Sequence, residues 1–293
     1  MNLFVFGLGY TASAFVRRYC GRFAHVAGTV RSLDKAEVLR GEGIEAFRFS
    51  DECADEGIAD ALAEADAVLI SIPPGPGGDP VLARHGEALG RAPRSAWIGY
   101  LSTVGVYGDQ RGAWVDESVP ATPKSERSRE RLAAENAWLA WGRRTGRAVQ
   151  VFRLAGIYGP GSNALANLAR GTARRVVKSG QVFNRIHVDD IATALMASIE
   201  RPRPGAIYNV ADDEPAPPQD VVAHAAALLG IPPPPETLFD PTAMSPMAAS
   251  FYAESKRVSN RLIKQELGWT PAHPSYREGL AALFAAGEGV QAA

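Results

Sequence analysis

The sequence predicts an α/β fold, a doubly wound parallel sheet with a smaller α/β lobe towards the C-terminus. Short apolar runs alternate with helix-like runs over the first half of the chain, as in parallel strands joined by crossover helices. A Gly-x-Gly-x-x-Ala sequence follows the first apolar run, and beyond residue 212 prolines break the chain into shorter segments. We expect a larger domain over residues 1–160, with segments returning at about 181–212. The smaller lobe would comprise residues 161–180 and 213–293.

The predicted elements follow one another in that alternation. Predicted strands of the larger domain occupy residues 3–6, 24–30, 44–49, 66–72, 96–101, 149–154 and 207–210. Predicted helices occupy residues 10–18, 33–40, 57–64, 81–90, 127–144 and 191–199, and two more, at 258–267 and 276–286, close the chain. Trp138 and Trp141 share one helix face, which we expect to be core or a subunit contact. Prolines 232–235 predict a stiff surface connector.

Composition narrows the class of protein. The chain has 293 residues, and its net charge of -1 gives no reason to expect nucleic acid or an anionic membrane as a partner. No apolar run approaches the roughly 18 residues of a membrane span, and the chain enters its first strand without a leader, so we expect a cytoplasmic protein. Cys20 and Cys53 are expected to be small apolar filler in a reducing compartment, not a disulfide.

The glycine-rich sequence after the first strand predicts a dinucleotide site. Gly7 permits a tight turn, Gly9 lets the backbone approach a pyrophosphate, and Ala12 lets the helix pack closely on the strand. The start of the helix, including Tyr10 and Thr11, offers N–H groups to the phosphates. The alternative is a glycine-rich turn that binds no ligand.

The end of the second strand predicts which dinucleotide binds. An NAD site places an acidic residue here, but this chain has Arg31 and Ser32. The planar guanidinium of an arginine is suited to a 2′-phosphate. We therefore predict NADP(H) in preference to NAD(H), the alternative being that Arg31 is a solvated loop residue.

Five ordered segments resemble the extended short-chain dehydrogenase/reductases, in particular the NAD-dependent epimerase/dehydratase group. They are residues 101–108, 115–117, 153–161, 187–190 and 267–271. The resemblance implies a Rossmann fold of the extended type and a homodimer formed through residues 81–90 and 127–144. It also extends the expected cofactor site, to Asp51 at the adenine, to the ribose-flanking segment after the fourth strand, and to the segment after the sixth. Those two segments are Ser71, Ile72 and Pro73, and Ala155 and Gly156.

The resemblance breaks at the catalytic motif. The family's Ser/Thr corresponds to Thr103, which we expect at the reacting group, but its Tyr and Lys positions are Arg127 and Arg131. A guanidinium, with a pKa above about 12, relays no proton near neutral pH. The chain therefore resembles an atypical member, in which Arg131 would contact the nicotinamide ribose and Arg127 would bind an anionic group of the substrate.

Several side chains are candidate replacements for the tyrosine, and each has a structural alternative. Tyr107 and His187 are expected to face the substrate, although Tyr107 belongs to a pocket-shaping loop and His187 to the Asp189–Asp190 turn. The remaining candidates are Tyr100 in its strand and Glu126 and Glu130, whose alternative is a solvated helix face. The five histidines show no metal-ligand spacing, so no metal is expected. No Gly-x-Ser-x-Gly elbow of a hydrolase is present.

These observations lead to one expected function and two alternatives. We expect an NADP(H)-dependent oxidoreductase or epimerase/dehydratase-like enzyme that acts on a small, anionic or sugar-type substrate. The first alternative is a non-catalytic NADP(H)-binding redox sensor or regulatory protein. The second is a structural scaffold with an empty site, which the glycines beside Arg31 disfavour.

Overall fold

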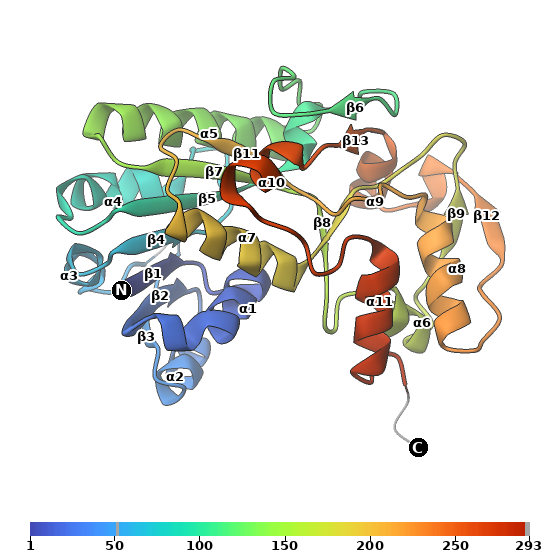
Figure 1. Ribbon diagram of the computed structural model, residues 1–293, viewed down its shortest axis with the longest axis horizontal. Helices are drawn as coiled ribbons and strands as arrows, with labels where there is room; N and C mark the ends of the chain where they lie inside the picture. Colours follow the sequence, from blue (N-terminus) through green and yellow to red (C-terminus); the bar gives the residue numbers. More distant parts are fainter. Residues whose placement is uncertain (51–52, 291–293) are drawn as a thin grey trace. The chain divides into compact units, whose positions relative to one another are not determined.

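A parallel sheet is the largest feature of the computed structural model, which describes residues 1–50 and 53–290. In that part of the chain the sheet has seven strands, in the order β11-β7-β5-β4-β1-β2-β3 (Figure 1). β1 pairs with β2 and β4, β2 with β3, and β4 with β5, all in parallel. The chain therefore starts in the middle of the sheet, builds outward to β3 and returns to β4 on the other side of β1. This order confirms the predicted doubly wound fold.

The elements of the sheet and its helices lie close to their predicted positions. The strands are β1 (Asn2–Phe6), β2 (His25–Val30), β3 (Glu45–Arg48), β4 (Ala67–Ile70), β5 (Trp97–Thr103), β7 (Val149–Leu154) and β11 (Ile207–Val210). The helices are α1 (Tyr10–Tyr19), α2 (Leu33–Gly41), α3 (Ile58–Ala63), α4 (Pro80–Arg91), α5 (Glu126–Thr145) and α7 (Val188–Glu200). Short 3-10 turns follow α1 and β5, at Cys20–Arg22 and Val104–Tyr107.

Alternate residues of the strands bury two faces of the sheet. On one face Phe4, Phe6 and Tyr100 join the core that α3, α4 and α5 cover. Trp138 and Trp141 of α5 meet edge to face, with ring centres 5.5 Å apart. Both indoles are buried, so the tryptophan face of α5 is core.

On the other face, α7 packs against β5 and β7 through a polar chain. The indole N–H of Trp97 donates to Ser198 Oγ at 2.9 Å, and Ser198 donates to Gln150 Oε1 at 2.8 Å. All three side chains are buried, so each of these hydrogen bonds prevents the cost of an unsatisfied polar group.

Three local expectations are wrong. Helix α7 begins at Val188, so Asp189 and Asp190 lie in its first turn and not before the helix. Carboxylates in the first turn complement the helix dipole. The expected helix from residue 258 begins only at Arg261, because Arg257–Val258 forms a strand. Cys20 is exposed and not an apolar filler, although it and Cys53 are free thiols.

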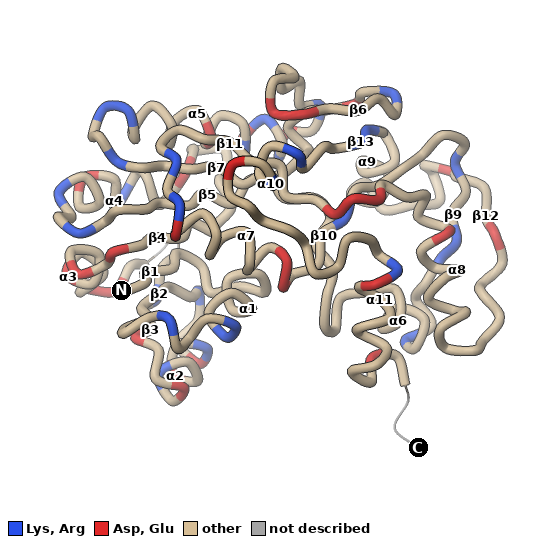
Figure 2. The backbone as a smooth tube through the Cα atoms, viewed as in Figure 1, with Lys and Arg blue, Asp and Glu red and all other residues tan. Residues whose placement is uncertain are grey.

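The described residues fall into two compact units. Unit 1 comprises Met1–Thr103, Glu126–Arg153 and Ile191–Tyr208, and unit 2 comprises Val104–Ser125, Leu154–Asp190 and the segment from Asn209 onwards. Residues 104–125, 154–160, 181–190 and 209–212, which we expected in the larger domain, thus lie in unit 2. Among the described residues, no helix combines the length and the hydrophobicity needed to cross a membrane. Figure 2 shows acidic and basic residues interspersed along the chain, in keeping with the net charge of -1.

Unit 2 is built from short elements around its own core. β8 pairs in parallel with β10, and Tyr158, Leu165, Tyr276 and Leu280 are buried together. Its strands are β6 (Trp114–Val115), β8 (Gly156–Tyr158), β9 (Arg175–Val177), β10 (Arg185–His187), β12 (Glu236–Leu238) and β13 (Arg257–Val258). Its helices are α6 (Ala164–Ala169), α8 (Pro218–Leu228), α9 (Pro246–Tyr252), α10 (Arg261–Leu267) and α11 (Tyr276–Ala285), with a 3-10 turn at Pro241–Ala243.

Candidate functional site

The glycine loop leaves the carboxyl end of β1 in unit 1, and its two glycines meet different surroundings. Gly7 has a φ of +89°, and a Cβ there would lie 2.8 Å from Ile72 Cγ1. By contrast, no atom lies within 4 Å of the place where a Cβ of Gly9 would stand. The backbone at Gly9 is therefore open to a ligand, while Gly7 closes the turn against the end of β4.

Hydrogen bonds to β2 hold this loop in place. The Gly7 amide donates to Thr29 Oγ1 at 2.9 Å, and the Leu8 amide donates to the Thr29 carbonyl at 2.9 Å. Thr29 is fully buried. Gly28 before it packs so closely on the loop that a Cβ would lie 2.7 Å from the Val5 carbonyl oxygen. The loop is therefore preorganised by the fold of unit 1.

Helix α1 follows the loop and presents its N-terminus at the same edge of the sheet. Gly9 is the N-cap and supplies no side-chain hydrogen bond, and the first turn carries no acidic residue. Ala12 is fully buried and Thr11 nearly so, whereas Tyr10 is exposed. An uncapped helix start of this kind is suited to an anion such as a pyrophosphate.

Basic side chains gather at the carboxyl end of β2. Arg31 and Ser32 are exposed, and Ser32 caps α2 by accepting from the Lys35 amide at 3.4 Å. Lys35 Nζ donates to the Leu8 carbonyl of the glycine loop at 2.6 Å. The sequence analysis did not single out Lys35, and its position one turn after Ser32 on a predicted helix was the available signal.

The remaining predicted cofactor residues are the segment after β4, Asp51, and the segment after β7. Ser71 and Ile72 are half-buried beyond the end of β4, and the Ser71 amide donates to the Phe6 carbonyl at 2.8 Å. Pro73 is exposed, and Asp51 lies outside the described residues. Ala155 and Gly156 belong to unit 2, so their expected contact with the cofactor stays a prediction.

The two arginines of the altered catalytic motif differ in their surroundings. Arg131 donates from NH1 to the Leu101 carbonyl at 2.8 Å and to Tyr100 Oη at 3.4 Å, so it is anchored on β5. Arg127, one helical turn earlier, is exposed. Thr103 ends β5 and is half-buried. Neither guanidinium supplies a proton at neutral pH, so in unit 1 this motif holds charges and hydroxyls but no acid or base of suitable pKa.

Tyr100 is a poor replacement for the missing tyrosine. Its ring is fully buried. Burial raises the pKa of its hydroxyl well above the ordinary value, although Arg131 opposes this shift. A phenol so reluctant to ionise is a structural partner of Arg131 rather than a proton relay.

A buried ion pair lies beneath the altered motif. Arg153 NH2 donates to Glu135 Oε2 at 2.8 Å, and Ser102 Oγ donates to Glu135 Oε1. The side chains of Glu135 and Arg153 are 1% and 5% exposed. This network joins α5 to β5 and β7 and so fixes the helix that carries Arg127 and Arg131.

The predicted substrate residues Tyr107 and His187 are buried side chains of unit 2. Tyr107 donates to Asn209 Oδ1 at 2.9 Å, and it is fully buried. His187 is 3% exposed, accepts from the Asp189 amide at Nδ1 and packs edge to face on Tyr158. Both have structural roles, and their contact with a substrate stays a prediction.

His187 also belongs to a cluster that the sequence spacing did not predict. Possible ligand atoms of His187, Asp190 and His273 all lie within 4.8 Å of one another. The Asp190 carboxylate, however, accepts from His273 Nδ1 at 2.9 Å and from the amides of Ala272 and His273 at 2.6 and 3.1 Å. These bonds account for the buried Asp190 as a tie between the start of α7 and the segment before α11.

Asp212 is a second buried carboxylate of unit 2 that the sequence analysis missed. It is 1% exposed and lies two residues after the end of β11. Burial raises the pKa of Asp212 to about 8, against the opposing effect of Arg185. Burial correspondingly lowers the pKa of Arg185.

Comparison with known proteins places these features in context. A model of the NAD dependent epimerase/dehydratase family matches residues 88–211. Protein YeeZ of Escherichia coli (strain K12) is 31% identical over 241 residues, covering 78% of this chain and 84% of that protein. A 3-diazoavenalumate denitrifying reductase from a Streptomyces species is 29% identical over 272 residues, covering 86% and 77%. The solved structure of a functionally unknown conserved protein from Silicibacter pomeroyi is 49% identical, with a TM-score of 0.89, and the match covers 98% of this chain and 99% of that one.

Proposed function

This chain belongs to the NAD-dependent epimerase/dehydratase family, as an atypical extended short-chain dehydrogenase/reductase, and on that premise we propose that it is an NADP(H)-dependent oxidoreductase acting on a small anionic substrate. The family takes a nicotinamide dinucleotide. The preference for the phosphorylated form, the class of substrate and the roles of the site residues are our proposals.

The observation that carries the proposal is the arrangement of backbone and basic side chains at the edge of the sheet where β1 and β2 end. There the open backbone at Gly9 lies beside an uncapped helix start, and Arg31 and Lys35 supply positive charge. No acidic residue stands at the end of β2, where an NAD site would hold the ribose hydroxyls. These residues fit a dinucleotide with a phosphate on its adenosine ribose.

Each part of the cofactor has proposed partners in unit 1. The loop residues Gly7, Gly9, Tyr10, Thr11 and Ala12 would hold the pyrophosphate, and Arg31 and Ser32 the 2′-phosphate. The segment Ser71–Ile72–Pro73 would flank the ribose, and the donors of Arg131 that β5 does not use would reach the nicotinamide ribose. The bound cofactor supplies a hydride.

The substrate class follows from the altered motif. Thr103 would orient the reacting group, and the exposed guanidinium of Arg127 would bind a carboxylate or phosphate of the substrate. The Streptomyces relative supports an oxidoreductase, since it is named a 3-diazoavenalumate denitrifying reductase. Epimerisation or dehydration of a sugar uses the family's tyrosine to move protons both to and from the substrate. Reduction by hydride consumes a single proton, which solvent water would supply here, so we favour a simple oxidoreductase.

The arginine at the tyrosine position also favours one alternative, a non-catalytic NADP(H)-binding redox sensor. Such a protein would bind the cofactor through the same edge of unit 1 and would need no proton relay. The half-buried Thr103 hydroxyl would then have no chemical role. Binding of NADPH without turnover of any anionic substrate would support the sensor.

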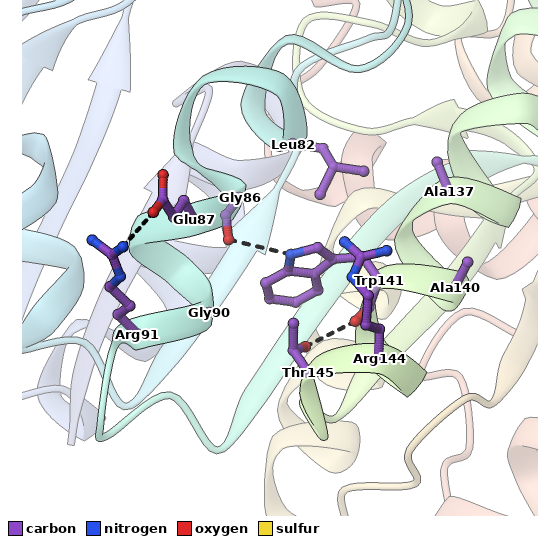
Figure 3. A pocket seen from close by; sticks show the side chains of 10 residues that line it. All are labelled: Leu82, Gly86, Glu87, Gly90, Arg91, Ala137, Ala140, Trp141, Arg144 and Thr145. Carbon is purple, nitrogen blue, oxygen red and sulfur yellow. Dashed lines mark hydrogen bonds and ion pairs between the residues drawn. The ribbon is translucent and has the colours of Figure 1, made fainter.

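We also propose that two copies associate through α4 and α5, as the resemblance to the family implies. A groove of about 670 Å³ runs between these helices (Figure 3). Its floor is made of small residues and Trp141, whose indole N–H donates to the Gly86 carbonyl at 3.2 Å. Glu87, Arg91 and Arg144 also line it, so the surface carries both signs of charge.

Calorimetric titration with NADPH, NADP, NADH and NAD tests the cofactor. We expect micromolar binding of the two phosphorylated forms, at least tenfold weaker binding of the others, and loss of this difference in Arg31→Ala, because one charge-assisted hydrogen bond contributes about 1.5–3 kcal/mol. Equal affinity for NADPH and NADH would contradict the preference. Binding of none of the four would reject the oxidoreductase and the sensor together.

A further inference from the structure

We infer that Lys35 is a specificity residue that links recognition of the 2′-phosphate to the loop that holds the pyrophosphate. The inference rests on the proposed function, because it concerns the same cofactor site. The observation behind it is the hydrogen bond from Lys35 Nζ to the Leu8 carbonyl, 2.6 Å long, which joins α2 to the glycine loop.

The position of Lys35 is set by the turn between β2 and α2. Ser32 caps α2 and accepts from the Lys35 amide, so the backbone of Lys35 lies in the first turn of the helix. Its side chain then reaches the carbonyl oxygen of Leu8, the residue between the two glycines. The side chain of Lys35 thus contacts the glycine loop, and its backbone lies one helical turn from Arg31 and Ser32.

The chemistry of an ammonium allows it to serve both places. A lysine Nζ has three N–H donors, and the Leu8 carbonyl takes one of them. Two donors remain for phosphate oxygens. Arg31 and Lys35 together outnumber Asp34, the acidic residue of this first turn, so the end of β2 carries a net positive charge.

The bond to Leu8 also places the charge before any ligand arrives. A free lysine side chain loses up to about 2 kcal/mol of rotamer entropy when it is fixed. Because Lys35 is already hydrogen-bonded to the loop, part of this entropy is lost on folding and not on ligand binding. Binding of a 2′-phosphate would in turn strengthen the hold of Lys35 on the loop, and this is the link that we infer.

Two nucleotides that differ only in the 2′-phosphate isolate this role. We would measure calorimetric Kd values of 2′,5′-ADP and 5′-AMP for the wild type, Lys35→Met, Lys35→Arg and Arg31→Ala, at low salt because exposed charges are screened. Lys124→Met, which removes an exposed lysine of unit 2, is the matched control for lost charge. Circular dichroism would check that every variant is folded.

We expect Lys35→Met to bind 2′,5′-ADP about tenfold more weakly than the wild type. It should also bind 5′-AMP two- to threefold more weakly, because the glycine loop, which would hold the 5′-phosphate, has lost its tie to α2. Arg31→Ala should weaken 2′,5′-ADP alone, Lys35→Arg should keep most of the preference, and Lys124→Met should change neither affinity.

Three results would overturn the inference, and they differ in what they say of the proposed function. If the wild type prefers 2′,5′-ADP and Lys35→Met keeps that preference, Lys35 has no part in specificity and the proposed cofactor stands. If the wild type binds neither nucleotide, the proposed cofactor site and the role of Lys35 both fail. If Lys35→Met lowers only the affinity for 2′,5′-ADP, Lys35 is a phosphate ligand and the link to the loop is wrong.

Discussion

Substitution of the two glycines of the loop by alanine should have different effects on stability and on cofactor binding. Gly7 has a positive φ, and a Cβ there would clash with Ile72. Gly7→Ala should therefore destabilise the protein by about 1–3 kcal/mol. Gly9 has an ordinary φ of -87° and open space beside it, so Gly9→Ala should fold with nearly unchanged stability. Its methyl group would nevertheless occupy the place where a pyrophosphate approaches, and NADPH binding should fall at least tenfold.

Urea unfolding and calorimetry of the two glycine variants separate these effects. A Gly9→Ala protein that binds NADPH as tightly as the wild type would show that the open space at Gly9 is not the pyrophosphate site. An unaltered midpoint for Gly7→Ala would show that the turn can relax around the added methyl group.

The buried Asp212 predicts a pH dependence of stability. Its pKa is about 8 in the folded protein, whereas a solvated aspartate has an ordinary value of 3.8. The folded state therefore holds the proton more tightly, and the stability that this provides below about pH 4 is lost as the pH rises towards 8. Relative to Asp212→Asn, the wild type should lose at most about 4 kcal/mol of unfolding free energy between pH 5 and pH 8.

Denaturant unfolding of the wild type and Asp212→Asn at both pH values provides the measurement. Only the change of their difference with pH bears on Asp212, because replacing its carboxyl group by an amide also alters the surroundings of Arg185 at every pH. A difference that stays constant from pH 5 to pH 8 would mean that Asp212 is ionised throughout this range.

At the scale of elements, the Glu135–Arg153 pair holds α5 against β7. Removing one partner of a buried ion pair leaves a charge without compensation, so Glu135→Gln should lower the unfolding free energy by about 3–5 kcal/mol. Glu200→Gln, in an exposed pair with Arg22, is the control and should have no measurable effect. Urea unfolding at neutral pH measures both effects. Equal changes in the unfolding free energy would show that the buried pair stabilises the protein no more than an exposed one.

The sequence predicted the elements of unit 1 well because their signals are local. The runs 149–154 and 207–210 form strands with those bounds, since each is a short, mostly apolar run with Gly146 or Gly205 a few residues before it. The two- and three-residue strands of unit 2, such as β6 and β13, carry no such periodicity and were missed. In the same way, the glycine loop was visible in its spacing. By contrast, the contact of Lys35 with Leu8 and the burial of Asp212 depend on chain segments that meet only in the fold.

At the scale of the whole molecule, the groove between α4 and α5 predicts the oligomeric state. A twofold dimer would bury the same surface on both copies, so a new charge in the groove is present twice in the interface. We expect sedimentation of the wild type as a dimer and of Ala137→Glu as a folded monomer. Ala169→Glu, at an exposed alanine that ends α6, should remain dimeric. A monomeric wild type would contradict the proposed dimer.

The division of the chain into units has a consequence for its synthesis. The chain passes between unit 1 and unit 2 five times, because unit 1 takes its residues from three separate segments. On a ribosome, β1 to β5 emerge first, and the free edge of β5 has no neighbour until β7 is made. An unpaired strand edge invites association with other chains. Neither unit can be obtained by cutting the chain at one point, and a nascent chain that stalls before residue 149 should depend on chaperones to remain soluble.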